Sequence, residues 1–80
     1  MSKYDPLRDY LSNYKGNKVA QTFRQIEDIL RDKLPSSAYT YRPWWGNDKT
    51  HIQAIAWLKA GWKVDAVNLT RQKVIFKKQP

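Results

Sequence analysis

The order of helix-like and strand-like patterns is the feature that most constrains how this chain can fold. Apolar residues recur at helical spacing in three segments within residues 6–60, and two runs of β-forming residues follow at 62–69 and 74–76. Only the polar stretch 70–73 separates these runs, so the sequence predicts a C-terminal antiparallel hairpin of undetermined turn type. Helices followed by a hairpin indicate an α+β fold.

Three helices are predicted, over residues 6–14, 23–33 and 51–60. The second and third begin at sequences that match capping boxes, Thr22 with Gln25 and Thr50 with Gln53. In a capping box the hydroxyl accepts from a backbone N–H and the amide side chain reaches back to the start of the helix. The third helix is apolar around much of its circumference, so we expect it to be the central and most buried one.

Winged-helix domains have the same order of elements. In such a domain the extended piece 18–22, too short here to be told from a linker, would pair with the hairpin. The hairpin would form the wing, and the third helix would enter the major groove of DNA. The sequence therefore predicts one α+β, winged-helix-like domain over residues 1–80, with three helices and a C-terminal antiparallel β-hairpin.

The positive charge of the chain is concentrated in its second half. The formal net charge is +8; residues 41–80 carry eight Lys or Arg against two Asp, whereas residues 1–40 carry seven against five acidic residues. Such asymmetry is typical of proteins that bind a polyanion, so we expect a nucleic acid as partner, with duplex DNA preferred. The alternative partner is an acidic protein, and the sequence does not fix the oligomeric state.

Two groups of residues are candidates for contact with nucleic acid. The first lies where the third helix begins: backbone N–H groups there attract anions, amide side chains match the edge of adenine, and an exposed ring would stack on a base. The second lies on the hairpin, where basic side chains would contact phosphates. The first group is Arg42, Trp45, Asn47, Lys49, His51 and Gln53, and the second is Lys63, Arg71, Lys73, Lys77 and Lys78.

A structural role is the alternative for the first group. Its polar residues would then cap the helix or close a turn, and both Trp44 and Trp45 would belong to the core. The hairpin lysines would also protect sheet edges from aggregation. Basic residues along one stripe would favour nucleic acid, whereas a basic rim around exposed tryptophan would favour a protein-interaction module or inhibitor that docks on an acidic protein surface.

The composition speaks against catalysis. The chain has no cysteine, one histidine and three glycines, so neither a zinc site nor a glycine-rich phosphate loop is expected. His51 and Asp48 could form a general base, but no nucleophile accompanies them. We therefore expect no enzyme activity, cofactor or metal. No apolar run is long enough for a membrane span and no signal peptide is visible, which favours a cytoplasmic protein with no membrane partner.

A pattern of residues along the chain resembles a known family. It includes Tyr4-Asp5-Pro6-Leu7, and its most specific part is Trp44-Trp45-x-Asn47-Asp48-x-x-His51-x-Gln53-Ala54-x-Ala56-Trp57-Leu58-x-Ala60-Gly61-Trp62. Over nearly the whole chain the sequence is similar to a small bacterial family described as a domain of unknown function. The resemblance implies a shared fold and a bacterial or phage origin, but no activity. A small DNA-binding regulator or a phage accessory protein fits these expectations.

Overall fold

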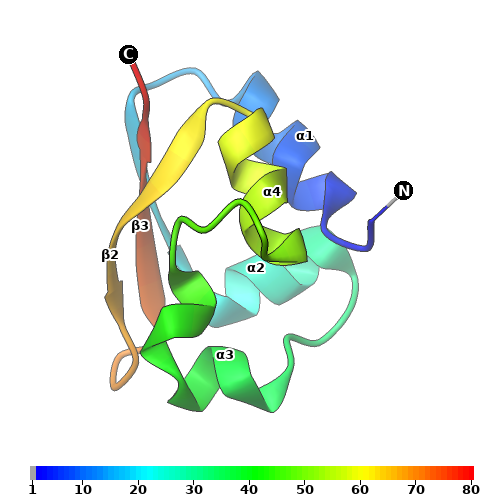
Figure 1. Cartoon of the computed structure of the whole chain (residues 1–80), viewed down its shortest axis with the longest axis vertical. Helices are drawn as coiled ribbons and strands as arrows, with labels where there is room; N and C mark the ends of the chain where they lie inside the picture. The colour runs from blue at the N-terminus through cyan, green and yellow to red at the C-terminus, as the bar shows by residue number, and fades with distance from the viewer. Residues whose placement is uncertain (1) are drawn as a thin grey trace.

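The computed structural model describes residues 2–80 and places the helices on one face of a three-stranded antiparallel sheet (Figure 1). Strand β3 is central, in the order β1-β3-β2, and both neighbours run antiparallel to it. The elements are α1 (Asp5–Asn13), β1 (Lys18–Thr22), α2 (Phe23–Leu30), α3 (Ser36–Thr40), the short 3-10 helix η1 (Arg42–Trp45), α4 (Ile52–Lys59), β2 (Trp62–Asn68) and β3 (Lys73–Lys78).

The α+β class is confirmed, but the description as three helices plus a hairpin is too simple. Within residues 2–80 there are four α-helices and three strands, because α3 forms between two predicted helices and β1 pairs with β3. In β1, Val19 is buried whereas Lys18 and Ala20 are exposed, the alternation of a strand with one solvated face. Five residues are too few for this alternation to identify a strand from sequence.

The helices end where the backbone conformation changes. α2 ends at Leu30 rather than at residue 33, because Arg31 adopts the left-handed conformation with φ 55°. α4 ends at Lys59, and Gly61 beyond it has φ 85°, which glycine adopts without steric strain. The sequence therefore predicts the end of α4 from Gly61, but it does not predict that α2 ends before Arg31.

One of the two predicted capping boxes is confirmed. The Thr22 hydroxyl accepts from the backbone N–H of Gln25 at 3.0 Å, and the Gln25 amide oxygen accepts from the backbone N–H of Thr22 at 2.8 Å. The box predicted for α4 is wrong, because this helix has no side-chain cap. The amide of Gln53 instead donates to the carbonyl oxygen of Trp44 at 3.0 Å.

Aromatic rings form much of the core between helices and sheet. Trp45 stacks on Phe23 and Trp57, with ring centroids 4.8 and 6.0 Å away. Trp57 in turn contacts Phe76 of β3, and Trp62 of β2 is fully buried. Large rings bury much apolar area at a small cost in side-chain entropy, which compensates for the limited core that a chain of this length can build.

α4 is the most buried of the described helices, as predicted, with four of its eight residues buried, but the burial is confined to one side. Ala54 and Trp57 have no exposed surface, whereas Ile52 is 55% exposed and Ile55 is partly exposed. The apolar circumference of this helix is therefore divided between a face in the core and a face toward solvent.

The sheet has one covered face and one open face. Val19, Trp62, Val74 and Phe76 point toward the helices and are buried. In Figure 1 the strands stand at the left with the helices to their right, and none of the described helices lies over the opposite face. Alternate residues of all three strands are therefore presented to solvent on that open face.

Candidate nucleic-acid interface

Three lysines form a row across the open face of the sheet. In the strand register, Lys77 of β3 lies opposite both Lys18 of β1 and Lys63 of β2. Directly opposed residues in an antiparallel sheet point to the same face, with Cβ atoms about 4.5–5.5 Å apart. All three lysines are exposed, so their positive charges are presented together.

The open face continues from this row toward the hairpin turn with apolar and then polar side chains. Ala20, Ile75 and Ala66 lie opposite one another in the middle, and Lys73 lies beside the turn, opposite Thr22 and Asn68. Arg71 is in the turn, where its backbone N–H donates to the side chain of the last residue of β2 at 3.0 Å. We define the basic sheet face by its residues on the strands: Lys18, Ala20, Lys63, Ala66, Lys73, Ile75 and Lys77.

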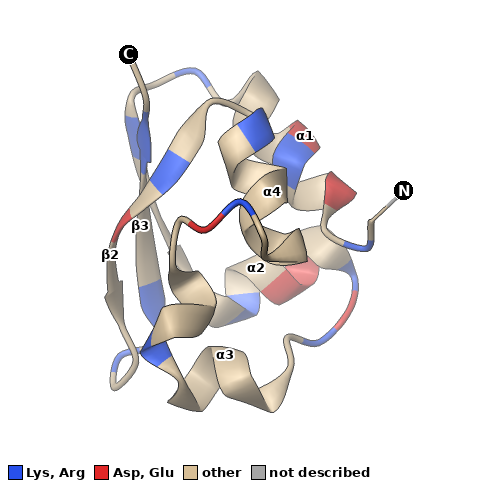
Figure 2. Cartoon of the chain, in the orientation of Figure 1, with Lys and Arg blue, Asp and Glu red and all other residues tan. Residues whose placement is uncertain are grey.

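One acidic residue lies within the three described strands. Asp65 is at a bulge in β2, and its Oδ2 is 3.7 Å from Lys18 Nζ. Figure 2 shows the strands with several basic segments and one acidic segment. Within residues 2–80, Lys63, Lys73 and Lys77 form no ion pair. Like charges placed opposite each other destabilise a sheet, so a bound anion would relieve this repulsion.

Asn47 and Arg42, predicted to contact nucleic acid, form hydrogen bonds to the outer edge of β2. The Asn47 Oδ1 accepts from Trp57 Nε1 at 2.9 Å and from the backbone N–H of Val64 at 2.8 Å. Its Nδ2 donates to the carbonyl oxygen of Val64 at 2.9 Å. Arg42 Nη1 donates to the carbonyl oxygen of Val67 at 2.7 Å. Both ends of the Asn47 amide are therefore used within the protein.

Trp45 and Gln53 also differ from the expectation that they contact a base. Trp45 is 2% exposed, and its Nε1 donates to the carbonyl oxygen of Ala38 at 2.8 Å. Gln53 is 7% exposed and donates to Trp44. Packing of η1 and the start of α4 into the core buries both side chains, so neither is available to a base.

The remaining predicted residues lie outside the basic sheet face. Lys49 is exposed in the loop before α4. Lys78 lies opposite Trp62 in the register, so its side chain is on the other side of the sheet from that of Lys77. It is exposed at the end of the sheet. Of the eleven predicted residues, the structure brings together Lys63, Lys73 and Lys77, with Arg71 in the adjoining turn.

His51 lies beside Asp48 at the start of α4. Its Nε2 is 4.0 Å from Asp48 Oδ2, and its Nδ1 is buried without a hydrogen-bond partner. The pKa of Asp48 lies below its ordinary value of 3.8, because the backbone N–H and the hydroxyl of Thr50 donate to the carboxylate. No group of three metal-ligating side chains occurs within residues 2–80.

The tryptophans form no exposed patch. Trp45, Trp57 and Trp62 are buried and Trp44 is partly buried. A basic rim around exposed tryptophan, the arrangement expected of a protein-docking module, is therefore not present in residues 2–80. The lysines across the sheet correspond to the other expectation, a stripe of basic residues.

Lys18 and the exposed isoleucines of α4 were missed by sequence reasoning. Lys18 joins the row only because β1 pairs with β3, which lies far away in sequence. The run Lys18-Val19-Ala20-Gln21 gives no clear polar–apolar alternation in the sequence, because the apolar Ala20 faces solvent and the polar Gln21 is buried. The signal for Ile52 and Ile55 was a helix that is apolar around much of its circumference in a chain too short to bury all of that surface.

The comparisons with known proteins give a family but no activity. The model of a family described as a domain of unknown function (DUF7662) matches residues 4–80. This match confirms the resemblance to a domain of unknown function. No curated protein and no solved structure matches the chain significantly. As for the membrane, none of the helices within residues 2–80 has the length and apolar character needed to cross a bilayer.

Proposed function

We propose that this chain, which belongs to the DUF7662 family of domains of unknown function, is a non-catalytic protein that binds the phosphate backbone of nucleic acid. The proposed contact surface is the basic sheet face together with Arg71 in the turn. The observation that carries the proposal is the row of Lys18, Lys77 and Lys63 across three neighbouring strands. Such a cluster would neutralise phosphates and release their counterions, the main source of sequence-independent affinity.

The connectivity supports a winged-helix-like arrangement as part of this proposal. The chain runs α1-β1-α2-α4-β2-β3, with α3 and η1 inserted before α4, and β1 lies beside the central strand of the hairpin. In that arrangement α4 would take the place of the recognition helix, and residues 69–72 would form the tip of the wing. Because α4 presents Ile52 and Ile55 to solvent, we propose that the sheet and wing, rather than α4, contact the nucleic acid.

Duplex is the proposed form of the nucleic acid. Proteins that bind single strands stack bases on exposed aromatic rings, and the basic sheet face carries no aromatic residue. Its centre consists of Ala20, Ala66 and Ile75, which offer no hydrogen-bonding group to a base. Lysine contacts phosphate as a point charge, so we propose binding with little sequence preference.

Fluorescence anisotropy with a labelled DNA duplex at about 50 mM salt tests the proposal. The double variant Lys73→Gln, Lys77→Gln should lose roughly tenfold in affinity for each lysine removed. With fewer phosphates neutralised, binding releases fewer counterions from the duplex. The loss should be similar for duplexes of unrelated sequence, because these contacts read no bases. Wild-type binding should weaken steeply as salt is raised.

The matched control is Lys3→Gln with Lys33→Gln, which removes the same charge from positions outside the sheet. This control variant should bind the duplex as the wild type does. If both double variants lose affinity equally, the attraction comes from net charge and the basic sheet face is not the site. If neither duplex nor single-stranded DNA or RNA binds at low salt, the proposed function fails.

A further inference from the structure

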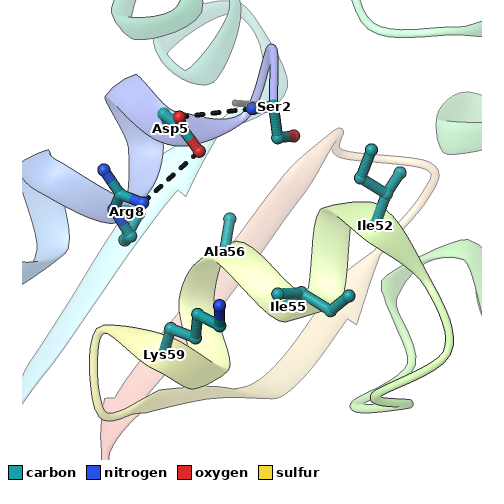
Figure 3. Close-up of a pocket in the computed structure, with 7 residues that line it drawn as sticks. All are labelled: Ser2, Asp5, Arg8, Ile52, Ile55, Ala56 and Lys59. Atoms are coloured by element: carbon teal, nitrogen blue, oxygen red, sulfur yellow. Dashed lines mark hydrogen bonds and ion pairs between the residues drawn. The ribbon is translucent and has the colours of Figure 1, made fainter.

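The solvent-facing side of α4 lines a groove of mixed apolar and charged character. Ile52, Ile55 and Ala56 of α4 line a hollow of about 540 Å³ together with the polar residues Ser2, Asp5, Arg8 and Lys59 (Figure 3). Within residues 2–80 there are two exposed large apolar side chains, of which Ile52 is one. Ile55 and Leu58 beside it are partly exposed, so Ile52 belongs to a contiguous apolar surface, the kind that a partner covers.

A second hollow of about 370 Å³ continues the apolar surface on the other side of Ile55. It is lined by Ile55, Leu58, Lys49 and Lys59. Residues three or four apart lie along one side of a helix, so Ile52, Ile55 and Leu58 extend over the length of α4. We define the α4 groove by Ile52, Ile55 and Leu58 with their basic neighbours Lys49 and Lys59.

The charges around the α4 groove are predominantly positive. Within residues 2–80, Lys49 and Lys59 form no ion pair. Two acidic residues lie beside the α4 groove, and both already accept hydrogen bonds. The Asp5 carboxylate accepts from the backbone N–H of Ser2 at 3.2 Å and is 3.5 Å from Arg8, and Asp48, next to Lys49 in the chain, accepts from Thr50. A partner that brings carboxylates would therefore find two lysines that form no ion pair.

We infer that the α4 groove binds an amphipathic helix of an acidic protein partner. Apolar residues of that helix at positions i, i+3 or i+4, and i+7 would cover Ile52, Ile55 and Leu58, as in other helix-in-groove complexes. Glutamate or aspartate on its flanks would pair with Lys49 and Lys59 in charge-assisted hydrogen bonds. This inference does not depend on the proposed nucleic-acid binding, because it concerns a different face of the molecule.

Charge complementarity argues against other occupants of the α4 groove. A second copy placed face to face would bring Lys49 and Lys59 against the same lysines of its partner. A nucleic acid would have to place charged phosphates on Ile52 and Ile55, which offer no donor to replace the lost water. An acidic amphipathic helix satisfies both the apolar floor and the basic rim.

The test uses a labelled synthetic helical peptide of about 14 residues, with leucine at the a and d positions of its heptads and glutamate elsewhere. We expect it to bind in anisotropy measurements and to shift backbone amide NMR signals of α4. Ile52→Asp should weaken binding by about tenfold or more, because it removes an apolar contact and repels glutamate. Tyr41→Asp is the matched control, since Tyr41 is 58% exposed but lies at the end of α3.

Three further measurements test which charge the peptide needs, where it binds and whether the variant is folded. The same peptide with lysine in place of glutamate should bind at least about tenfold more weakly, because it would meet Lys49 and Lys59. The Lys73→Gln, Lys77→Gln variant should keep its affinity for the acidic peptide, which separates the groove from the basic sheet face. Circular dichroism should show Ile52→Asp to be folded, since the position is exposed.

The inference is overturned if the acidic peptide does not bind, or if it binds the folded Ile52→Asp variant as tightly as the wild type. It is also overturned if the lysine peptide binds equally well, which would indicate nonspecific hydrophobic binding. Sedimentation gives a further decisive outcome: a wild-type dimer that Ile52→Asp converts to monomers would show that a second copy covers the groove.

Discussion

Asn47 ties the loop before α4 to the edge of the sheet through both ends of its amide. Its oxygen holds the indole N–H of Trp57 and the backbone N–H of Val64, and its nitrogen donates to the Val64 carbonyl. Trp57 is fully buried, and the Asn47 oxygen is the acceptor of its indole N–H. A side chain suited to reading adenine thus serves the fold, because an amide has the same donor and acceptor for a backbone as for a base.

Asn47→Ala should lower the free energy of unfolding by about 1–3 kcal/mol, because it leaves the Trp57 indole N–H buried without an acceptor. Urea denaturation checks this. Asn13→Ala is the control, since Asn13 is exposed and makes one bond to the carbonyl oxygen of Asp9; it should stay within about 0.5 kcal/mol. Unchanged stability of Asn47→Ala with lost nucleic-acid binding would instead restore a contact role for Asn47.

Thr50 controls the ionisation of Asp48. The carboxylate accepts from the Thr50 backbone N–H at 2.9 Å and from its hydroxyl at 2.7 Å, and these bonds hold the pKa of Asp48 below 3.8. The folded-state pKa is depressed, so the stability contributed by this carboxylate is present above pH 3.8 and is lost as the pH falls through the lowered value.

Thr50→Val should raise the pKa of Asp48 toward 3.8 without fully reaching it, because the backbone N–H still donates. NMR titration of the side-chain carboxyl carbon measures this value. Thr40→Val is the control, since the Thr40 hydroxyl donates to the carbonyl oxygen of Ser36 and does not contact Asp48. An unchanged pKa in Thr50→Val would mean that the hydroxyl does not stabilise the carboxylate.

At the scale of elements, two helices end in left-handed residues that differ in type. Arg31 after α2 has φ 55° and ψ 37°, a conformation that strains a residue with a Cβ atom. Gly61 after α4 has φ 85°, and a Cβ added there would meet no atom within 4 Å. At Gly61 the backbone conformation therefore decides the effect of substitution.

Arg31→Gly should raise the free energy of unfolding by up to about 1 kcal/mol, because relief of strain exceeds the entropy that glycine adds to the unfolded chain. Gly61→Ala should lower the free energy of unfolding by about 1 kcal/mol, because alanine is strained at the positive φ of this position. Thermal and urea denaturation of both variants measure these changes. Opposite signs are required; destabilisation by Arg31→Gly would show that the arginine side chain makes a stabilising contact.

The elements that could be predicted from the sequence are those set by local contacts. The start of α2 follows from Thr22 and Gln25, which bond only to each other's backbone. The same pattern before α4 gave a wrong prediction of a capping box. The Gln53 side chain donates to the carbonyl oxygen of Trp44, a tertiary contact, and does not return to the start of its own helix. For the site, the hairpin lysines could be predicted from their positions on two adjacent strands. The place of Lys18 follows only if residues 18–22 pair with the hairpin, a long-range contact that the order of elements suggests but that no local pattern fixes.

At the scale of the whole molecule, two chemically different surfaces lie on separate sides of one core. The basic sheet face looks away from the helices, whereas the α4 groove lies on the helical side between α4 and α1 (Figures 1 and 3). α4 contributes Trp57 to the packing against the sheet and turns Ile52 to solvent. The proposed nucleic acid and the inferred acidic helix would therefore occupy different layers of the fold.

If both proposals hold, the two ligands should bind independently at physiological salt. The protein measures 29 × 25 × 24 Å, and the core separates the two surfaces, so the ligands would lie well beyond the Debye length of about 8 Å at 0.15 M salt. The affinity for the acidic peptide should thus be the same with and without saturating duplex, which anisotropy of the labelled peptide measures. A large loss of peptide affinity at this salt would show that both anions compete for one basic surface, and a gain would require a conformational coupling between sheet and α4.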